Sequence, residues 1–328
     1  MKKVLLLFGG NSSEHLVSCK SAKSILEHID YKKYHVTTVG ISKENEWYLY
    51  HDSIENITEW QTKKTQRIDS IIRFLKQFDI VFPILHGTNG EDGKIQALLE
   101  LFHIPYVGCN SKISSIGMDK HYFKILLSHF HIPVVPFLLY DKKMSFKEIQ
   151  NCIPYPIIIK PCNGGSSIGI TIANNKKELK KGIKIAEKYD SKILLEPFLK
   201  MRELECAVLE NKKRFTISPI GEIRSDHAFY DYEAKYVDDS SKAELAINIP
   251  EDVTINIQKI AASVSKHLEI QGLSRIDFFY LPDQNKIYVN EINTIPGFTT
   301  ISMYPKLLTN EKFTYQDLIT TLIENAHY

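Results

Sequence analysis

The amino-acid sequence contains no long hydrophobic run. Its first apolar stretch, Val4 to Phe8, covers five residues before Gly9 and Gly10. That length is too short for the core of a secretion signal and far too short to span a membrane, although the start Met1-Lys2-Lys3 resembles the basic beginning of a signal peptide. No later apolar run is long enough either. We therefore expect neither a signal peptide nor a membrane-spanning segment.

Paired cysteines and a strong net charge are also missing. The five cysteines are an odd number, and no two stand at C-x-x-C spacing. This pattern disfavours a disulfide framework and a thiolate zinc site, and it suits a reducing cytosol, so we expect a cytoplasmic protein. The net charge of +2 is too small to favour a nucleic acid or an anionic membrane as the main partner.

What the sequence does contain predicts a soluble globular protein of two or three domains. Its 328 residues include 43% apolar and 24% charged side chains, which are ordinary proportions for a chain that buries a large core. Strand and helix patterns alternate in the first third, which indicates a parallel, wound α/β sheet. Ligands bind beyond the carboxyl ends of such strands, so the loops after Phe8 and Leu85 are candidate binding segments. The expected strands are 4–8, 35–41, 79–85 and 104–108, and the expected helices are 13–28 and 94–102.

The pattern changes near Met118, where a helix over 120–129 leads into a region of antiparallel character. We place domain boundaries near residues 118 and 198. The sequence thus predicts an N-terminal α/β domain followed by two α+β domains, with the ranges 1–118, 119–198 and 199–328. Later expected elements are a long polar loop (225–241), a helix (255–268) and a two-strand unit (274–293).

The strongest chemical signal lies in that two-strand unit. Side chains alternate along a strand, so Arg275 and Asp277 share one face and Glu291 and Asn293 share another. A hairpin can bring these faces together. Two carboxylates and an amide oxygen suit magnesium held with nucleotide phosphates, and an arginine beside them can stabilise developing negative charge. The alternative is a surface ladder of ion pairs, which the apolar neighbours of these residues disfavour.

A second signal is Lys160, which ends an apolar strand and precedes a glycine- and serine-rich loop over 163–169. Glycines let backbone N–H groups approach phosphate oxygens, and serines add donors. The segment matches neither a Walker motif nor the G-x-G-x-x-G of dinucleotide folds. Taken alone, it fits a plain hairpin turn equally well.

Weaker signals come from acidic and polar residues at expected loops. Glu196 and Glu203 could hold ribose hydroxyls and Phe198 could pack on a purine, but an exposed acidic loop is as good an interpretation. Ser13 could simply cap the helix that follows it, with Glu14 near the positive helix end, or Glu14 could bind substrate. His86 follows a strand end and could be only a turn residue.

In this order, the motifs closely resemble those of the D-alanine–D-alanine ligases of the ATP-grasp superfamily. The resemblance covers essentially the whole chain. Its parts are FGGNSSEHLVS (8–18), LHGTNGEDG (85–93), MDK (118–120), IIKPCNGGSSIGI (158–170), FYDYEAKY (229–236), SRIDFF (274–279) and NEINTIPGFT (290–299).

The resemblance implies a three-domain ATP-grasp fold that grips ATP between its central and C-terminal domains. It implies that Lys120 and Lys160 contact the phosphates, that the Ser166 loop closes over them, and that Lys235 reaches the γ-phosphate. Glu196 would lie at the adenine and Glu203 at the ribose. Ser167, Phe198 and Asn290 complete the expected ATP site. Magnesium, or manganese in its place, would be held as two ions by Asp277, Glu291 and Asn293.

The same resemblance assigns the substrate side. Glu14 would hold the ammonium of the first D-alanine, and Tyr236 and Ser166 would bond with Glu14. Ser302 would bind the carboxylate of the second D-alanine, and Arg275 with the Gly297 N–H would form the oxyanion site. His86 is also expected among the substrate-binding residues.

The activity implied is ATP-dependent synthesis of D-alanyl-D-alanine through an acyl phosphate, a step of peptidoglycan synthesis, by an enzyme that is commonly a homodimer. The polar stretch 225–241 is the expected closing loop. Two departures, His15 after Glu14 and Ile301 before Ser302, bear on the choice of second substrate. Rival interpretations are a D-alanine–D-serine or D-alanine–D-lactate ligase, another ATP-grasp enzyme such as a carboxylase, and a nucleotide-binding regulatory protein without turnover.

Overall fold

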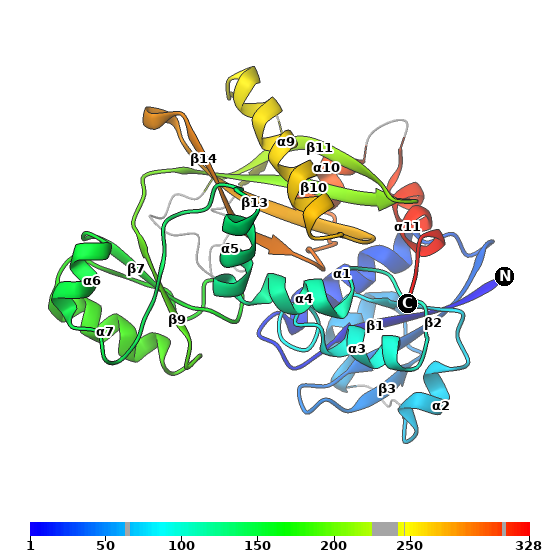
Figure 1. The fold of residues 1–328 in the computed structure, drawn as a ribbon. Coiled ribbons are helices and arrows are strands. Elements are labelled where there is room, and N and C mark those ends of the chain that lie inside the picture. The colour runs from blue at the N-terminus through cyan, green and yellow to red at the C-terminus, as the bar shows by residue number, and fades with distance from the viewer. Residues whose placement is uncertain (63–65, 225–241, 246, 310–312) are drawn as a thin grey trace.

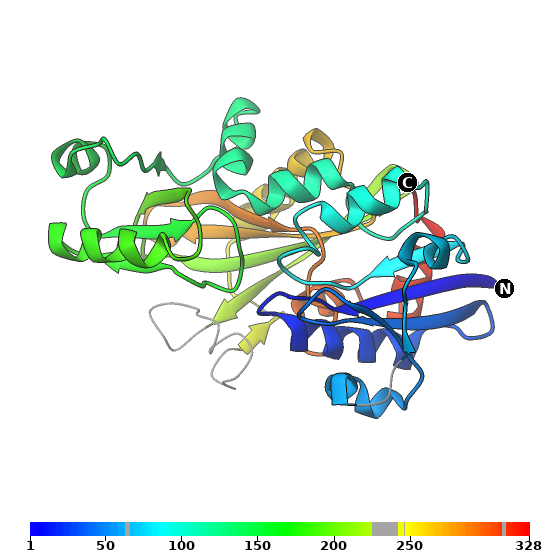
Figure 2. The same cartoon turned by 90° about the horizontal axis from the view of Figure 1, so that it is seen from below.

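The structure is a computed structural model that describes residues 1–62, 66–224, 242–245, 247–309 and 313–328. Its strands form three sheets, which Figure 1 shows in blue, in green and in yellow-green to orange. Seen from below in Figure 2, the green lobe and the blue lobe lie at opposite ends, with the third sheet between them. Within the described residues, no helix is both long and apolar enough to cross a membrane.

The first sheet has the strand order β4-β3-β2-β1-β5. Its core is the expected parallel unit, because β2 and β5 both pair with β1 in parallel, while β3 and β4 add antiparallel edges. Residues Val4 to Phe8 of β1 are at most 1% exposed, as a central strand covered on both faces requires. The strands are β1 (Lys2–Gly9), β2 (Tyr34–Ile41), β3 (Trp47–Tyr50), β4 (Gln66–Arg67) and β5 (Ile80–Pro83).

Helices cover both faces of this sheet. Because side chains alternate along β1, Leu6 packs with α1 and η1 on one face, and Leu7 packs with α2 and α3 on the other. The covering elements are α1 (His15–His28), η1 (Ile54–Thr62), α2 (Ile71–Leu75) and α3 (Lys94–Leu101). The strand expected over 104–108 is wrong: only Tyr106 forms isolated bridges, because Pro105 lacks an N–H and Gly108 turns the chain at φ +124°.

The second sheet forms the lobe at the left of Figure 1, with the order β6-β9-β7-β8. Its buried face packs on α6 and α7, and α6 begins with a capping box between Ser145 and Glu148. The elements are β6 (Leu138–Leu139), α6 (Phe146–Cys152), β7 (Ile157–Pro161), β8 (Thr171–Ala173), α7 (Lys176–Ala186) and β9 (Ile193–Pro197).

Two helices, α4 (Ser111–Met118) and α5 (Lys120–His129), connect the first and second sheets. Residues Phe123 and Leu127 of α5 share a core with Leu204 and Phe278 of the third sheet. The helix that follows the expected boundary at residue 118 therefore packs with the third sheet. The N–H of its first residue, Lys120, donates to the Cys162 carbonyl at 3.0 Å, just after β7.

The third sheet has the order β12-β11-β10-β13-β14, and all its neighbours are antiparallel. The expected two-strand unit is confirmed as the hairpin of β13 and β14. The elements are β10 (Arg202–Asn211), β11 (Arg214–Arg224), β12 (Lys242–Glu244), α9 (Glu251–His267), β13 (Leu273–Leu281), η2 (Pro282–Gln284) and β14 (Lys286–Asn293).

After this hairpin the chain returns to the first sheet. Helix α11 (Tyr315–Glu324) lies beside it in Figure 1, in red, and α10 (Met303–Leu308) contributes Met303 and Tyr304 to the core of β1 and α1. Residues Leu318 and Ile323 of α11 share the core of β1 and α1. The segment between Asn293 and α10 thus passes directly over the loops that follow β1 and β5.

Candidate active site

The hairpin of β13 and β14 brings the expected polar residues together. Cross-strand pairing sets Arg275 opposite Asn293 and Asp277 opposite Glu291. The Arg275 guanidinium donates to both Asp277 oxygens at 2.7 Å, and Asn293 Nδ2 donates to Asp277 Oδ2 at 3.0 Å. Glu205 of β10 lies opposite Asp277 and pairs with Arg275 Nε at 3.2 Å. These side chains form one network centred on Asp277.

The donor set of this network fits a divalent cation. Asp277 and Glu291 offer carboxylate oxygens, and Asn293, whose Nδ2 donates to Asp277, offers its amide oxygen. Oxygen donors of this kind are those that magnesium prefers. A cation there would share the Asp277 carboxylate with Arg275, so metal and guanidinium would act on the same small region.

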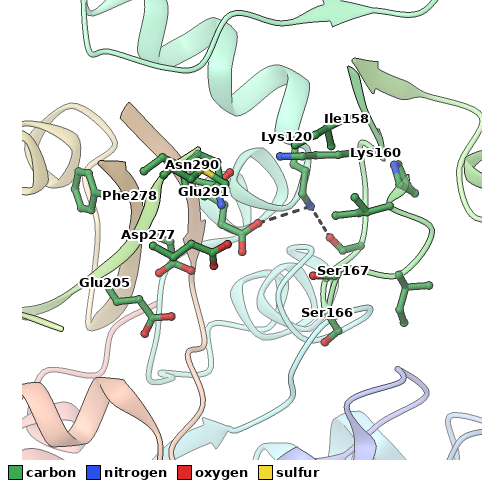
Figure 3. Close-up of a pocket in the computed structure, with 18 of the residues that line it drawn as sticks. Lys120, Ile158, Lys160, Ser166, Ser167, Glu205, Asp277, Phe278, Asn290 and Glu291 are labelled. Carbon is green, nitrogen blue, oxygen red and sulfur yellow. Dashed lines mark hydrogen bonds and ion pairs between the residues drawn. The ribbon is translucent and has the colours of Figure 1, made fainter. Parts of the chain in front are cut away.

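Lys120 joins the hairpin to the glycine-rich loop. Its Nζ donates to the Gly164 carbonyl at 2.7 Å and lies 4.0 Å from Glu291 Oε2 (Figure 3). Asp119 fixes the start of α5 by accepting from two backbone N–H groups of its first turn. The pocket around Lys120 is lined by the expected residues Lys160, Ser166, Ser167, Glu203, Asp277, Asn290 and Glu291, among others.

The glycine-rich loop adopts an unusual backbone. Ser166 and Ser167 have φ values of +54° and +58°, which are costly for residues other than glycine. The Ser166 Oγ is buried and has no hydrogen-bond partner among the described residues. A side-chain carbon on Gly165 would lie 3.4 Å from the Glu14 carboxylate. The loop therefore reaches across from the second sheet to the substrate side of the first.

Behind the pocket, Glu196 is buried between two lysines. It is 1% exposed and pairs with Lys124 at 2.8 Å and with Lys160 at 2.7 Å. Burial by itself raises the pKa of Glu196, but the two lysine charges outweigh it and lower the pKa to about 2. The role of Lys124 was not predicted from the sequence, although this residue stands one helical turn after Lys120.

The remaining expected nucleotide residues are less closely grouped. Glu203 lines the pocket, whereas Glu196 and Phe198 do not. The Phe198 N–H donates to the Pro156 carbonyl at 2.9 Å, which fixes the backbone just after β9. Lys235, Tyr236 and the expected closing loop 225–241 lie outside the described residues.

The loops after β1 and β5 meet at Ser12. Its Oγ donates to the His86 carbonyl at 2.6 Å and accepts from the Glu14 N–H at 3.1 Å. The first helix begins at His15 with Glu14 as its N-cap residue, so the capping role considered for Ser13 is wrong. The Glu14 side chain, 9% exposed, lies against Gly87, where a side-chain carbon would come within 2.9 Å of it.

His15, one of the two departures, is turned away from the substrate side. It is 5% exposed, its Nδ1 bonds with the Gly10 carbonyl at 2.6 Å, and its Nε2 accepts from Trp60 at 3.3 Å. The ring stacks on Trp60. The residue thus braces the Gly9-Gly10 turn. Ile301, the other departure, is 75% exposed.

His86 and Glu91 both contact the segment that follows β14. His86 Nδ1 bonds with the Ile295 carbonyl at 2.9 Å, and Glu91 Oε1 accepts from the Ile295 N–H at 3.0 Å. Burial lowers the pKa of His86, although the Glu14 charge opposes it. Burial and the Glu14 charge raise the pKa of Glu91 to about 8. Glu91 was not singled out from the sequence.

The expected pair Gly297 and Ser302 is also brought together. A side-chain carbon on Gly297 would lie 2.9 Å from Ser302 Oγ, so only glycine fits there without displacement. Ser302 Oγ accepts from the Thr299 N–H at 3.0 Å. This turn presents a backbone N–H and a hydroxyl close to one another.

Two family models match this chain. "D-ala D-ala ligase N-terminus" matches residues 3–109, and "D-ala D-ala ligase C-terminus" matches residues 126–324. The chain belongs to the D-alanine–D-alanine ligase family. It is therefore an ATP-dependent ligase with the ATP-grasp fold.

Individual relatives agree over the full length. A D-alanine–D-alanine ligase of Clostridium acetobutylicum is 45% identical, with 99% of this chain and 98% of that protein covered. One from Caldicellulosiruptor bescii is 44% identical, with coverages of 99% and 94%.

Solved structures of the ligase family are also similar. VanG D-Ala:D-Ser ligase of Enterococcus faecalis has a TM-score of 0.89 at 35% identity, with 98% of each chain covered. A D-alanine–D-alanine ligase of Bacillus anthracis, complexed with ATP, has a TM-score of 0.78 at 26% identity, with 99% of this chain and 97% of that one covered.

Proposed function

We propose that this enzyme joins two D-alanine molecules into D-alanyl-D-alanine for peptidoglycan synthesis. The observation that carries the proposal is that curated relatives 40–45% identical over 99% of this chain are D-alanine–D-alanine ligases. The site supports it, because the pocket lined by Lys120 and Lys160 lies beside a loop whose Gly165 approaches the Glu14 carboxylate. The division into domains at residues 118 and 198, with ATP between the central and C-terminal ones, is part of this proposal.

On the nucleotide side, Lys120 and Lys160 bind the phosphates, and Ser166 and Ser167 cover them with the loop after β7. Glu196 holds Lys160 from behind the pocket and lies at its adenine end, while Glu203 binds the ribose. Phe198 packs on the purine, and Asn290 completes the lining. Lys235 would contact the γ-phosphate from outside the described residues. ATP binding would replace part of the Lys120–Gly164 contact with a phosphate contact.

The metal-binding part of the proposal rests on Asp277, Glu291 and Asn293, whose donors suit two magnesium ions or manganese in their place. When bound, such ions would supply positive charge that offsets the charge of the phosphates. Arg275 lies within the same network and can neutralise charge that develops on the transferring phosphoryl group.

The reaction follows from the weakness of a carboxylate as an acyl donor. With Glu14 holding its ammonium, the first D-alanine attacks the γ-phosphorus through a carboxylate oxygen, and the bond to ADP breaks. The neutral amine of the second D-alanine then attacks the acyl carbon, the bond to phosphate breaks, and the amine loses a proton. Arg275 and the Gly297 N–H stabilise the oxyanion formed between these events.

The second D-alanine would be bound by its carboxylate at Ser302. The Ser166 hydroxyl, which has no partner among the described residues, is free to bond with Tyr236 and Glu14 as the family resemblance implies. We further propose that the enzyme is cytoplasmic, since the sequence suits a reducing compartment, and that it is a homodimer, as the family resemblance implies.

The test is phosphate release by the purified protein with Mg-ATP and D-alanine alone, then with D-serine or D-lactate added and the products separated. Strong release with D-alanine alone, yielding the dipeptide, is expected. Release that requires D-serine or D-lactate would overturn the choice of substrate while leaving the ligase chemistry intact.

A further inference from the structure

The segment that carries Gly297 is held by polar side chains from the loop after β5 and from helix α1. Glu91, in the loop after β5, accepts from the Ile295 N–H at 3.0 Å through Oε1 and from the Gly87 N–H at 2.9 Å through Oε2. His86, in the same loop, bonds with the Ile295 carbonyl at 2.9 Å. Both polar backbone groups of Ile295 are therefore taken by side chains of one loop.

The other end of the segment is fixed by α1. Ser21 Oγ accepts from the Phe298 N–H at 3.1 Å and lies 2.9 Å from His86 Nε2. Ser21 and Phe298 are fully buried, and His86 is 3% exposed. We name Ser21, His86 and Glu91 the bracket. It grips the backbone on both sides of Gly297.

The bracket allows one arrangement of protons. The Ile295 carbonyl only accepts, so a neutral His86 carries its proton on Nδ1 and accepts on Nε2. The Ser21 hydroxyl must then donate to Nε2, and its oxygen remains free to accept from Phe298. Each donor has one acceptor, and neither ring nitrogen of His86 is left for a substrate.

We propose that His86, Ser21 and Glu91 are positioning residues that act through the backbone of residues 295–298 and aim the Gly297 N–H at the oxyanion. This rests on the proposed function, and it changes the role of His86 from direct substrate binding to alignment of the catalytic turn. Since a preorganised donor works only if it is held in place, loosening the turn costs transition-state stabilisation and leaves ATP binding intact.

The experiment compares two replacements of His86. Asparagine places its amide nitrogen where Nδ1 lies and keeps the bond to Ile295, whereas glutamine places its amide near Nε2 and keeps a partner for Ser21. We expect kcat for phosphate release to fall roughly tenfold further in His86→Gln than in His86→Asn, with KM for ATP unchanged in both.

Backbone protection supplies a readout that does not depend on turnover. Amide hydrogen exchange in a peptide covering 294–302 should quicken at least roughly tenfold in Glu91→Gln and Ser21→Ala. Two matched control variants should leave the exchange of this peptide unchanged. Glu100→Gln alters a carboxylate that accepts from the Ser111 N–H at 2.8 Å, outside the segment 294–302. Ser265→Ala removes a buried serine hydroxyl of α9.

The possible outcomes distinguish a positioning role for the bracket from direct substrate binding by His86. If the two His86 variants have equal kcat and a raised KM for D-alanine, with exchange unchanged in the Glu91 and Ser21 variants, His86 binds substrate directly and the bracket is refuted. If a His86 variant fails to fold, Ser21→Ala decides through exchange and kcat. If the wild-type protein releases no phosphate with D-alanine, the proposed function fails, and exchange alone still tests the bracket.

Discussion

The nucleotide side and the substrate side of this ligase are built from different interactions. Around the pocket, full charges face one another, as in Glu196 between Lys124 and Lys160 or Arg275 against Asp277. Around the turn at Gly297, most contacts join neutral side chains to backbone groups. The difference suits the proposed ligands, because phosphates need compensating charge whereas an oxyanion donor needs a fixed backbone.

The largest effect is expected from replacing charged residues at the centre of the nucleotide side. Glu291→Ala and Arg275→Ala should each lower kcat by roughly 10²–10³-fold or more, because Arg275 would supply positive charge to the transition state and Glu291 would hold the metal ions that do the same. Phosphate release measures the loss, and circular dichroism checks that the fold survives. Activity like that of the wild type in either variant removes the role assigned to that residue.

The buried lysine should matter for stability. Lys124→Met leaves Glu196 with one partner in a site that is 1% exposed, so urea unfolding should show a loss of about 3–5 kcal/mol. Lys142→Met is the matched control, since Lys142 pairs with Glu187 but its side chain is 78% exposed. The control should lose far less stability, because solvent screens an exposed ion pair. Equal losses would show that Lys124 is no more than a surface charge.

Acid should weaken the cluster of Glu196, Lys124 and Lys160 over a defined pH range. The pKa of Glu196 is lowered from 4.5 to about 2 in the folded protein, so its contribution is present above pH 4.5 and is lost as pH falls from 4.5 toward 2. Urea unfolding of the wild type and of Glu196→Gln across this range measures it. The variant should have a shallower acid dependence, and parallel curves would contradict the assignment.

The smallest effect should come from His15, on the neutral side. His15→Asn keeps a donor for the Gly10 carbonyl and loses the contact with Trp60, so stability should fall by about 1 kcal/mol. The product ratio with mixed D-alanine and D-serine should stay that of the wild type. A changed ratio would restore His15 as a determinant of the second substrate.

What the sequence predicted correctly depends on local pattern. Alternation along two strands joined by a short turn was enough to bring Arg275, Asp277, Glu291 and Asn293 together, and a run of apolar residues was enough for the buried strand at Val4 to Phe8.

The features that the sequence did not predict depend on partners that are distant along the chain. A lysine on a helix reads as exposed, and Lys124 is buried because Glu196 of β9 comes against it from far along the chain. Glu91 likewise gains its role from Ile295. Pro105 and Gly108 ended the expected strand at 104–108, and only the His327 backbone gives Tyr106 its second partner there.

The return of α11 to the first sheet has a consequence for synthesis on the ribosome. The core face that β1 and α1 offer is completed by Leu318, Ile319, Leu322 and Ile323, and Glu324 pairs with Lys2 at 2.5 Å. Because translation proceeds at about 5–20 residues per second, the nascent first sheet waits many seconds with that face uncovered. During that wait, chaperones that recognise apolar surface have a defined place to bind.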